Sequence, residues 1–454
     1  MNRVSMFSAA FRPTLKEHGL YYLRILFICL FMLWIPLCLF YGAVYKRTSF
    51  AHLVRLKIVD FDQGPVGNAI TQALLVQNQP SDHTRAIWQE SSNDRNFRSV
   101  RDVSEWVRKN GWAVLVIHSN ASRQLELALA DTETYNPEDA MTLFVSSGHN
   151  PIIYSLMVAS TTAADLGKAT NAFAIAMVRE IQSGSVNVDI PSASALLGAE
   201  DSAKVLAVLF TQPISYRQID VAPFTFDIAP VVYLFCFLVG MLCTIGPMIG
   251  WKMSSFSFYL KVRHRDLWLS IVGLIFAWTI IFGMYGALAF SAFRGLNYSE
   301  NALKYTVGRF FSLWATIAIT LMAVALWLFC WFTLLPPEVL GLASVVTLLP
   351  NVVSSISIAE LAPHFYRWMH ALPFYNGAIL YRHILSGGYP RIGANLGIIL
   401  GEICTMSLIL CALTWIRQLM VLCGISDAAG WVRGNIFFHS PVPYYKEKAE
   451  SVTT

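Results

Sequence analysis

Apolar residues are gathered into long runs that are separated by one extended polar region. The first run covers Ile25–Val44, and the polar region after it ends near residue 225. Each run is long enough to cross a hydrocarbon core of ~30 Å. Five further runs cover about 228–250, 267–290, 310–335, 339–360 and 393–422. The pattern therefore predicts about six transmembrane helices, one before the polar region and five after it, of which the fifth is weakened by Pro350.

Charge and short motifs predict the orientation of these runs. The first run is preceded by basic residues but lacks a small-residue cleavage site, so we interpret it as a retained anchor and not a signal peptide. The loop Trp251–Asp266 is rich in Lys and Arg, which favours the cytoplasmic side. This topology places the polar region and two candidate glycosylation sites, Asn120 and Asn297, outside. Basic residues at 46–57 argue in the opposite direction.

Within the polar region, the residue pattern alternates between strand-like and helix-like segments. The stretches VRLKIVDF and WAVLVIH are typical of strands. Helices are predicted near 65–77, 101–109 and 122–130, with one or two more in 152–182. The segment 184–196 is predicted to be a loop. The fold class that follows is an α-helical polytopic membrane protein with an inserted extracytoplasmic α/β domain.

Composition agrees with a membrane protein and narrows its chemistry. Hydrophobic residues make up 55% of the 454 residues and charged residues 13%, with a mean hydropathy of +0.51, whereas an average soluble domain is about 25% charged. The net charge of +5 gives no reason to expect a nucleic-acid partner. Neither a Walker A nor a G-x-S-x-G motif occurs, so we expect no ATP site, no catalytic residue and no enzymatic activity. Cysteine and histidine spacings predict no metal site, and no cofactor is expected.

The acidic turn after the first predicted strand has a calcium-loop spacing at its start. Asp60 and Asp62 are followed by Gly64, but the downstream acid that a calcium loop needs is missing, because Thr71 is the twelfth residue counted from Asp60 and Gln72 follows it. We therefore interpret these residues as a turn in which Asp62 accepts backbone N–H bonds and Gly64 leads into the next helix.

Polar residues within the apolar runs are candidates for a transport pathway. Glu402 lies near the middle of the last run, where a lone carboxylate costs at least ~2.5 kcal/mol. It is either a pathway or proton-coupling acid, or the partner in an interhelical hydrogen bond. Thr347, Asn351 and Ser355 recur at i, i+4 and i+8 and so share one face of a helix. That face either lines a cavity or packs against another helix.

The segment 361–392 is predicted to lie in the membrane interface or to re-enter the membrane. Its aromatic and apolar residues recur on one helical face. His370 and His383 lie in the same segment, and their spacing does not suit a metal site. A transferase that uses either histidine as a base remains a distant alternative.

Four stretches carry a resemblance to a known family: VRLKIVDFDQGPVGNAI, GWAVLVIHSNASRQLELAL, PISYRQIDVAPFTFDIAPVVY and LPFYNGAILYRHILSGGYPRIGANLGI. In these stretches the chain resembles the fungal nitrosoguanidine-resistance membrane proteins, whose layout is similar to ABC-2 type permeases and phage-infection-protein homologues. The resemblance implies an outer domain between the first two spans and an elbow helix at SAAFRPTLKEHGLYY. It also implies a re-entrant hairpin at 361–392 and a loop at 251–266 that couples to a separate ATPase.

These observations give a domain division and a functional hypothesis. The expected parts are a cytoplasmic N-terminus (1–24), a first transmembrane helix (25–45), an extracytoplasmic α/β domain (46–225), a five-helix membrane domain (226–423) and a cytoplasmic tail (424–454). The expected function is export or translocation of hydrophobic toxic compounds or lipids across a fungal plasma membrane, giving drug resistance. A non-transporting protein that regulates lipid asymmetry or organises partners is the alternative. Expected partners are membrane lipids, hydrophobic small molecules, a second copy of the chain and an ATPase subunit.

Overall fold

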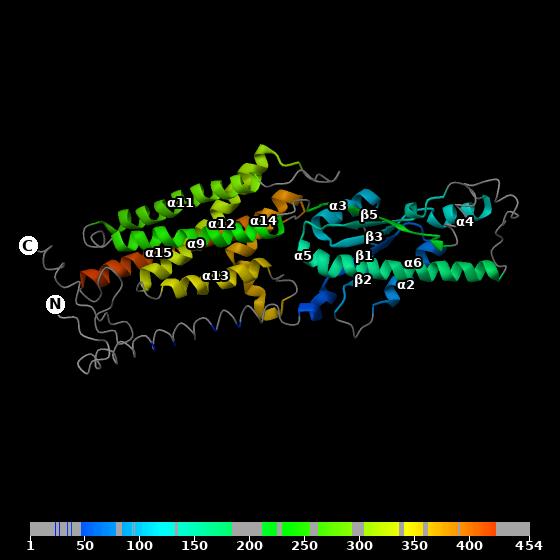
Figure 1. Cartoon of the computed structure of the whole chain (residues 1–454), viewed down its shortest axis with the longest axis horizontal. Coiled ribbons are helices and arrows are strands. Elements are labelled where there is room, and N and C mark those ends of the chain that lie inside the picture. Colours follow the sequence, from blue (N-terminus) through cyan, green and yellow to red (C-terminus); the bar gives the residue numbers. More distant parts are fainter. Residues whose placement is uncertain are drawn as a thin grey trace, which may run out of the picture.

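The computed structural model shows a helical bundle and a sheet domain side by side along the long axis of the molecule (Figure 1). It describes residues 47–78, 84–131 without 93 and 95, 135–183, 211–224, 229–254, 262–292, 304–335, 340–356, 362–388 and 391–423, together with the helical residues Leu23, Phe27, Trp34 and Cys38. The described parts of 47–224 form the sheet domain, and those of 229–423 form the bundle.

The sheet has five described strands in the order β2-β1-β3-β4-β5. The strands are β1 (Arg55–Asp60), β2 (Ile87–Glu90), β3 (Ala113–Ile117), β4 (Met141–Val145) and β5 (Tyr216–Asp220). Strand β1 pairs in parallel with both β2 and β3, β4 is antiparallel to β3, and β5 is parallel to β4. Every residue of β3 and β4 is buried, so these two strands form the centre of the domain.

Successive residues of the strands point to opposite faces and build two separate cores. Ile58 and Leu115 belong to the larger core, which includes residues of α2, α4 and α6. Val59 and Val114 belong to the smaller core, which α3 covers. The helical elements are η2 (Arg47–Leu53), α2 (Pro65–Val76), α3 (Val100–Asn110), α4 (Ala121–Asp131), η3 (Pro137–Asp139), α5 (Pro151–Ile153), η4 (Tyr154–Val158) and α6 (Ala159–Gln182).

The strands and helices predicted between residues 55 and 131 are confirmed, as is the long helical stretch that ends at Gln182. Local signals explain this agreement, since Pro65 opens α2 and the Ser99 hydroxyl accepts the Asp102 N–H at the start of α3. Strands β2, β4 and β5 were not predicted. Strand β2 has only four residues and β5 is a polar edge strand, so neither length nor apolar alternation marks these two, whereas β4 is as long as β3 and nearly as apolar.

The bundle is organised around α12. Helix α12 packs against α9, α11, α13, α14 and α15. In the 18-residue apolar stretch of α12, 72% of the residues are buried inside the molecule. In the corresponding stretches of α11 and α15 the buried shares are 28% and 11%. The elements are α9 (Ala229–Ser254), α11 (His264–Ala292), α12 (Val307–Leu334), α13 (Leu340–Ile356), η8 (His364–Ala371), α14 (Pro373–Ser386) and α15 (Ile392–Leu422). Helices α11 and α15 therefore present most of their apolar surface outward.

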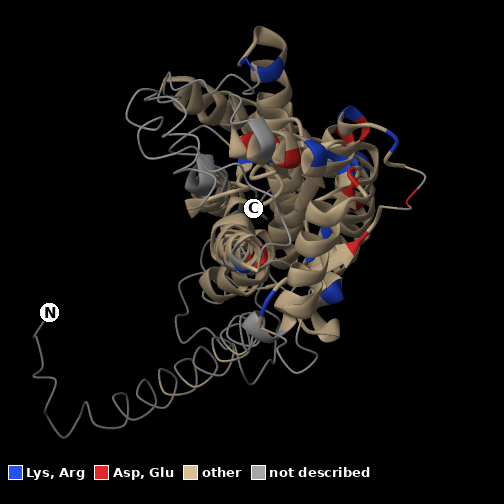
Figure 2. Cartoon of the chain, turned by 90° about the vertical axis from the view of Figure 1, so that its right-hand side faces the viewer, with Lys and Arg blue, Asp and Glu red and all other residues tan. Residues whose placement is uncertain are grey.

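Three of the predicted spans, now α11, α12 and α15, are confirmed as helices long and apolar enough to cross a membrane. The runs at 228–250 and 339–360 form helices whose apolar segments, Cys236–Trp251 and Leu340–Ser355, are shorter. Apart from Phe27, Trp34 and Cys38, the first run lies outside the described residues. Figure 2, viewed from the sheet-domain side, shows the charged residues spread over that domain. The molecule therefore combines a sheet domain with a helical part that has the character of a membrane protein.

Candidate functional site

The polar stripe on α13 is buried and faces the start of α14. Thr347, Asn351 and Ser355 are each no more than 3% exposed. The Thr347 and Ser355 hydroxyls donate to carbonyl oxygens of their own helix, those of Ala343 and Val352. These bonds satisfy the two hydroxyl donors within α13.

Asn351 links two helices. Its amide nitrogen donates to the Thr347 carbonyl oxygen at 3.0 Å, and its Oδ1 accepts the Phe374 backbone N–H at 3.3 Å. Phe374 lies in the first turn of α14, where backbone N–H groups have no partner within the helix. Asn351 thus caps α14 from a neighbouring helix. The predicted shared face is confirmed, and this contact supports helix packing, whereas the transport role stays a prediction.

Glu402 lies on α15, which packs against α12, α14 and α11. Its side chain is half-buried, and Oε2 is buried without a hydrogen-bond partner among the described residues. An unsatisfied buried polar atom is costly, so it calls for a functional explanation or an unseen partner. The structure therefore leaves both interpretations of Glu402 open.

The candidate glycosylation site Asn120 is exposed in the turn between β3 and α4. It has a φ of 69°, and its carbonyl oxygen accepts the Gln124 N–H. Asn297 lies outside the described residues. Asn120 is accordingly placed where a glycan could be carried.

The acidic turn after β1 is held by hydrogen bonds to two aspartate carboxylates. Asp60 Oδ1 accepts the backbone N–H groups of Asp62 and Gln63 at 2.8 and 3.1 Å. Asp62 accepts both the N–H and the hydroxyl of Ser122, at 3.1 and 2.5 Å. A Cβ added to Gly67 would lie 2.2 Å from Asp60 Oδ2, so the carboxylate is closely enclosed. These contacts agree with a turn stabilised by carboxylate–backbone bonds.

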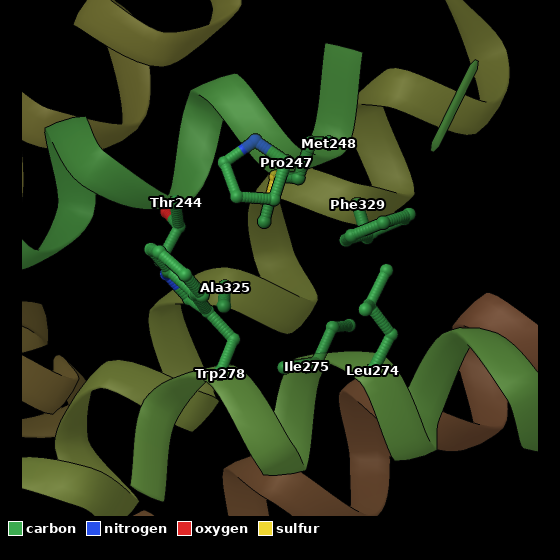
Figure 3. Close-up of a pocket in the computed structure, with 8 residues that line it drawn as sticks. All are labelled: Thr244, Pro247, Met248, Leu274, Ile275, Trp278, Ala325 and Phe329. Carbon is green, nitrogen blue, oxygen red and sulfur yellow. The ribbon is translucent and has the colours of Figure 1, made fainter. Parts of the chain in front are cut away.

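An apolar gap between α9, α11 and α12 is too small for a substrate. Figure 3 shows side chains from these helices around it, including Pro247, Trp278 and Phe329. Its volume is about 10 Å³, whereas ligand pockets are typically ~300–1,000 Å³. The gap is a packing irregularity beside a proline within α9.

A larger cavity lies where the ends of α12, α14 and α15 meet. Its volume is about 440 Å³, within the range of small-molecule sites. The lining residues are Arg309, Ser312, Ala315, Thr316, Ile319, Leu380, His383, Ile384, Gly387, Ile392 and Leu396. Most of these side chains are apolar, and the few polar ones include one cation. This is the composition expected of a site for an amphipathic molecule.

Local signals determine where each of the three helices that border this cavity begins or ends. The Thr306 hydroxyl accepts the Arg309 N–H and caps the start of α12. Helix α14 ends at Gly387, whose φ of 72° is the left-handed conformation that glycine adopts readily. Helix α15 then begins with two backbone N–H groups donating to the carbonyl oxygen of Arg391.

Arg309 is the residue that sequence reasoning missed. It is half-buried, and its Nη1 is buried with no acceptor among the described residues. An arginine at the end of a long apolar run ordinarily extends its guanidinium to the membrane interface, so its position in the sequence did not mark it as a site residue. The predicted span began at residue 310 and so left Arg309 outside. His383 also lines the cavity, whereas His370 packs its ring against Tyr375 at 4.8 Å.

The cavity is joined to the sheet domain through the end of α14. Arg382 Nη1 donates to the His149 carbonyl oxygen at 2.9 Å. A Cβ added to Gly148 would lie 2.2 Å from the Ser386 Cβ, which shows how closely the two lobes approach. Burial lowers the pKa of His149 to about 4, and the Arg382 charge acts in the same direction, against the hydrogen bond to the Val107 carbonyl. This contact of Arg382 and Ser386 with Gly148 and His149, called the joint below, is therefore close and buried, and His149 is neutral in it near pH 7.

Comparison of the sequence with protein-family models assigns the chain to a family. The family model described as "Protein of unknown function (DUF3533)" matches residues 24–408. The chain belongs to the DUF3533 family. The DUF3533 match includes the sheet domain, Glu402 and every residue that lines the cavity. No curated protein and no solved structure matches the chain.

Proposed function

We propose that this protein is an ABC-2 permease-like membrane transporter that moves hydrophobic toxic compounds or lipids and so confers resistance. The observation that carries the proposal is the cavity between α12, α14 and α15. It is large enough for a ligand, mostly apolar, and open toward the bundle surface at Leu396, which is 37% exposed. A membrane-dissolved molecule could enter such a site from the side.

The proposed topology has about six spans, with the sheet domain inserted on the outer side of a fungal plasma membrane. The basic loop at 251–266 and the exposed Asn120 support this orientation. The resemblance to nitrosoguanidine-resistance proteins supports the assignment to a fungal membrane. The sequence contains no Walker A motif, so the energy for transport would come from a partner subunit or from a gradient.

The outward apolar faces of α11 and α15 are compatible with contact to lipid or to a second copy of the chain. A homodimer is proposed because ABC-2 permeases, which the layout resembles, work as pairs. The basic loop at 251–266 is the proposed contact for a separate ATPase subunit.

A non-transporting regulator is the second candidate function. The joint between Arg382 and His149 favours it, because the same helix end both lines the cavity and contacts the sheet domain. Occupation of the cavity would then be signalled to the outer domain without movement of a molecule across the membrane.

Loss of a preloaded fluorescent phospholipid distinguishes the two functions. Cells lacking the protein are compared with cells expressing it, with and without ATP depletion. Faster loss in expressing cells supports transport, and sensitivity to ATP indicates a partner ATPase. Equal rates at normal surface expression would contradict transport and favour the regulator.

The predicted pathway residues are tested in the same assay. Glu402→Gln removes the half-buried carboxylate, and Asn351→Leu removes the cap of α14. The pathway prediction requires at least one of these variants to slow the loss of lipid at normal expression. Wild-type rates in both would contradict a role for these residues in transport.

A further inference from the structure

We infer that the cavity at the ends of α12, α14 and α15 binds an amphipathic anion, whose charged headgroup lies at Arg309. The inference rests on the proposed function, because both use the same cavity. It adds the charge and the chemical class of the ligand, which an apolar cavity alone would not specify.

The first argument is the unmet hydrogen-bonding capacity of Arg309. A guanidinium stays protonated in proteins and carries five N–H donors. Its Nη1 is buried without an acceptor among the described residues, and none of the described residues that line the cavity is Asp or Glu. The side chain as a whole is half-buried, and a buried N–H donor that lacks an acceptor is unfavourable. A carboxylate or phosphate headgroup supplies the missing acceptors, in the planar geometry that arginine favours.

The second argument is the field of the surrounding helix ends. Arg309 is in the first turn of α12, and Ile392 is the first residue of α15, so two helix N-termini border the cavity. Neither helix has an acidic residue in its first turn. A cation at a helix N-terminus is unfavourable, whereas an anion there is stabilised by the helix dipole. A bound anion would interact favourably with both helix N-termini and would give Arg309 a hydrogen-bond acceptor of opposite charge.

The C-terminal end of α14 has the opposite polarity and also borders the cavity. One of its last four carbonyl oxygens, that of His383, accepts the Gly387 N–H at 2.8 Å, and the Ser386 hydroxyl donates to the Arg382 carbonyl oxygen at 2.9 Å. His383 places a basic side chain at the same end. The repulsion of an anion by α14 is therefore reduced.

The third argument is the apolar remainder of the cavity, which a free inorganic anion would not need. Ile319, Leu380 and Ile384 line it, and the partly exposed Leu396 lies at the bundle surface. A hydrocarbon chain packs against these apolar side chains, whereas an inorganic anion makes no use of them. The ligand is thus an anionic headgroup that carries a hydrocarbon chain.

Binding of fluorescent single-chain lipids to the purified full-length chain tests the inference. Four probes share one acyl chain and differ in headgroup: a carboxylate, a phosphate monoester, a zwitterionic phosphocholine and a neutral glycerol ester. Inorganic phosphate serves as a competitor. The variants are Arg309→Gln, Arg309→Lys and, as a matched control outside the cavity, the exposed Arg367→Gln on η8.

The expected result is that wild type and Arg367→Gln bind the two anionic probes at least about tenfold more tightly than the neutral probe. Arg309→Gln should lose this preference but bind the neutral probe as wild type does, which shows that its fold is intact, while Arg309→Lys keeps part of the preference. The tighter of the two anionic probes identifies the headgroup. Equal binding of all four probes by wild type, or an unchanged preference in Arg309→Gln, would overturn the inference. Displacement by inorganic phosphate at the same concentration as by an anionic lipid would also overturn it.

These results are separable from the proposed function. No charge preference, combined with lipid loss that depends on the cavity, would reject the anionic ligand and leave transport standing. A charge preference without any lipid loss would keep the ligand and reject transport.

Discussion

Arg382 in α14 donates from Nη1 to the carbonyl oxygen of His149, 2.9 Å away, and so ties the helical bundle to the sheet domain. Both residues are buried, at 6% and 8% exposure. Because α14 also lines the cavity, this contact connects the candidate ligand site to the other lobe.

Arg382→Leu should destabilise the purified protein by about 1.5–3 kcal/mol, because a hydrogen bond from a charged donor is lost and the His149 carbonyl loses that donor. The measurement is thermal unfolding in detergent, with limited proteolysis to locate the loosened region. Arg367→Gln is the control, since Arg367 is exposed. Equal melting of Arg382→Leu and wild type would contradict a role of this bond in holding the lobes together.

His149 should make stability depend on pH. Its pKa is lowered from 6.5 to about 4, chiefly by burial. The unfolded chain therefore binds more protons than the folded chain between these values, so stability is fully present above pH ~6.5 and falls as the pH approaches ~4. Burial raises the pKa of Asp220, against its hydrogen bonds from Ser147 and Ala222, and contributes the opposite sign at low pH.

The His149→Gln variant separates these two contributions. Melting temperature between pH 7 and 5 should fall less steeply in this variant than in wild type, because the buried neutral imidazole is gone. Identical slopes would show that the titration of His149 does not control the joint.

Asp60→Ala should destabilise the sheet domain by about 1–3 kcal/mol, because the backbone N–H groups of Asp62 and Gln63 lose their acceptor. Chelation by EDTA should leave the melting temperature of wild type unchanged if the turn is held by hydrogen bonds alone. A clear rise in melting temperature on adding calcium would instead support the calcium-loop interpretation. The melting temperatures of the variant, and of wild type with EDTA or calcium, are measured by differential scanning fluorimetry.

Asn120→Gln tests the proposed orientation of the sheet domain. If this domain is extracytoplasmic, the wild-type protein from a eukaryotic host should shift in mobility after glycosidase treatment. Asn120→Gln should lose that shift or part of it, and Asn297→Gln reports on the second sequon. A glycosidase shift that Asn120→Gln does not change would mean that Asn120 is unmodified and would remove this support for the orientation.

The sequence predicted the parts of the fold that are specified locally. Pro65 marks a helix start, and the apolar stretches of β1 and β3 are typical of strands, so these elements were found. The helix near 101–109 was also predicted, and the structure adds Ser99 as its cap. The polar strand β5 was missed because it is an edge strand held by pairing with β4. The shared face of Thr347 and Asn351 was predicted from spacing alone.

The candidate site was predicted less completely, because its geometry depends on contacts between distant segments. Asn351 caps a helix that begins more than twenty residues later, at Pro373, and spacing within α13 does not reveal this. Arg309 and Leu396 meet across one cavity only because α12 and α15 pack together. Glu402 remains a prediction from the sequence that the geometry has not assigned to either role.

Transport through the cavity is tested most directly by comparing lipid loss from cells that express wild type, Ser312→Trp or Phe311→Trp. Ser312 is an exposed residue that lines the cavity, so a tryptophan there should occlude it with little risk to the fold. Phe311 is its neighbour on α12, 50% exposed and outside the lining, and serves as the matched control. We expect cells that express Ser312→Trp to lose labelled lipid at the rate of cells without the protein, whereas cells that express Phe311→Trp match wild type. Equal rates for the two variants at equal surface expression would contradict transport through this cavity.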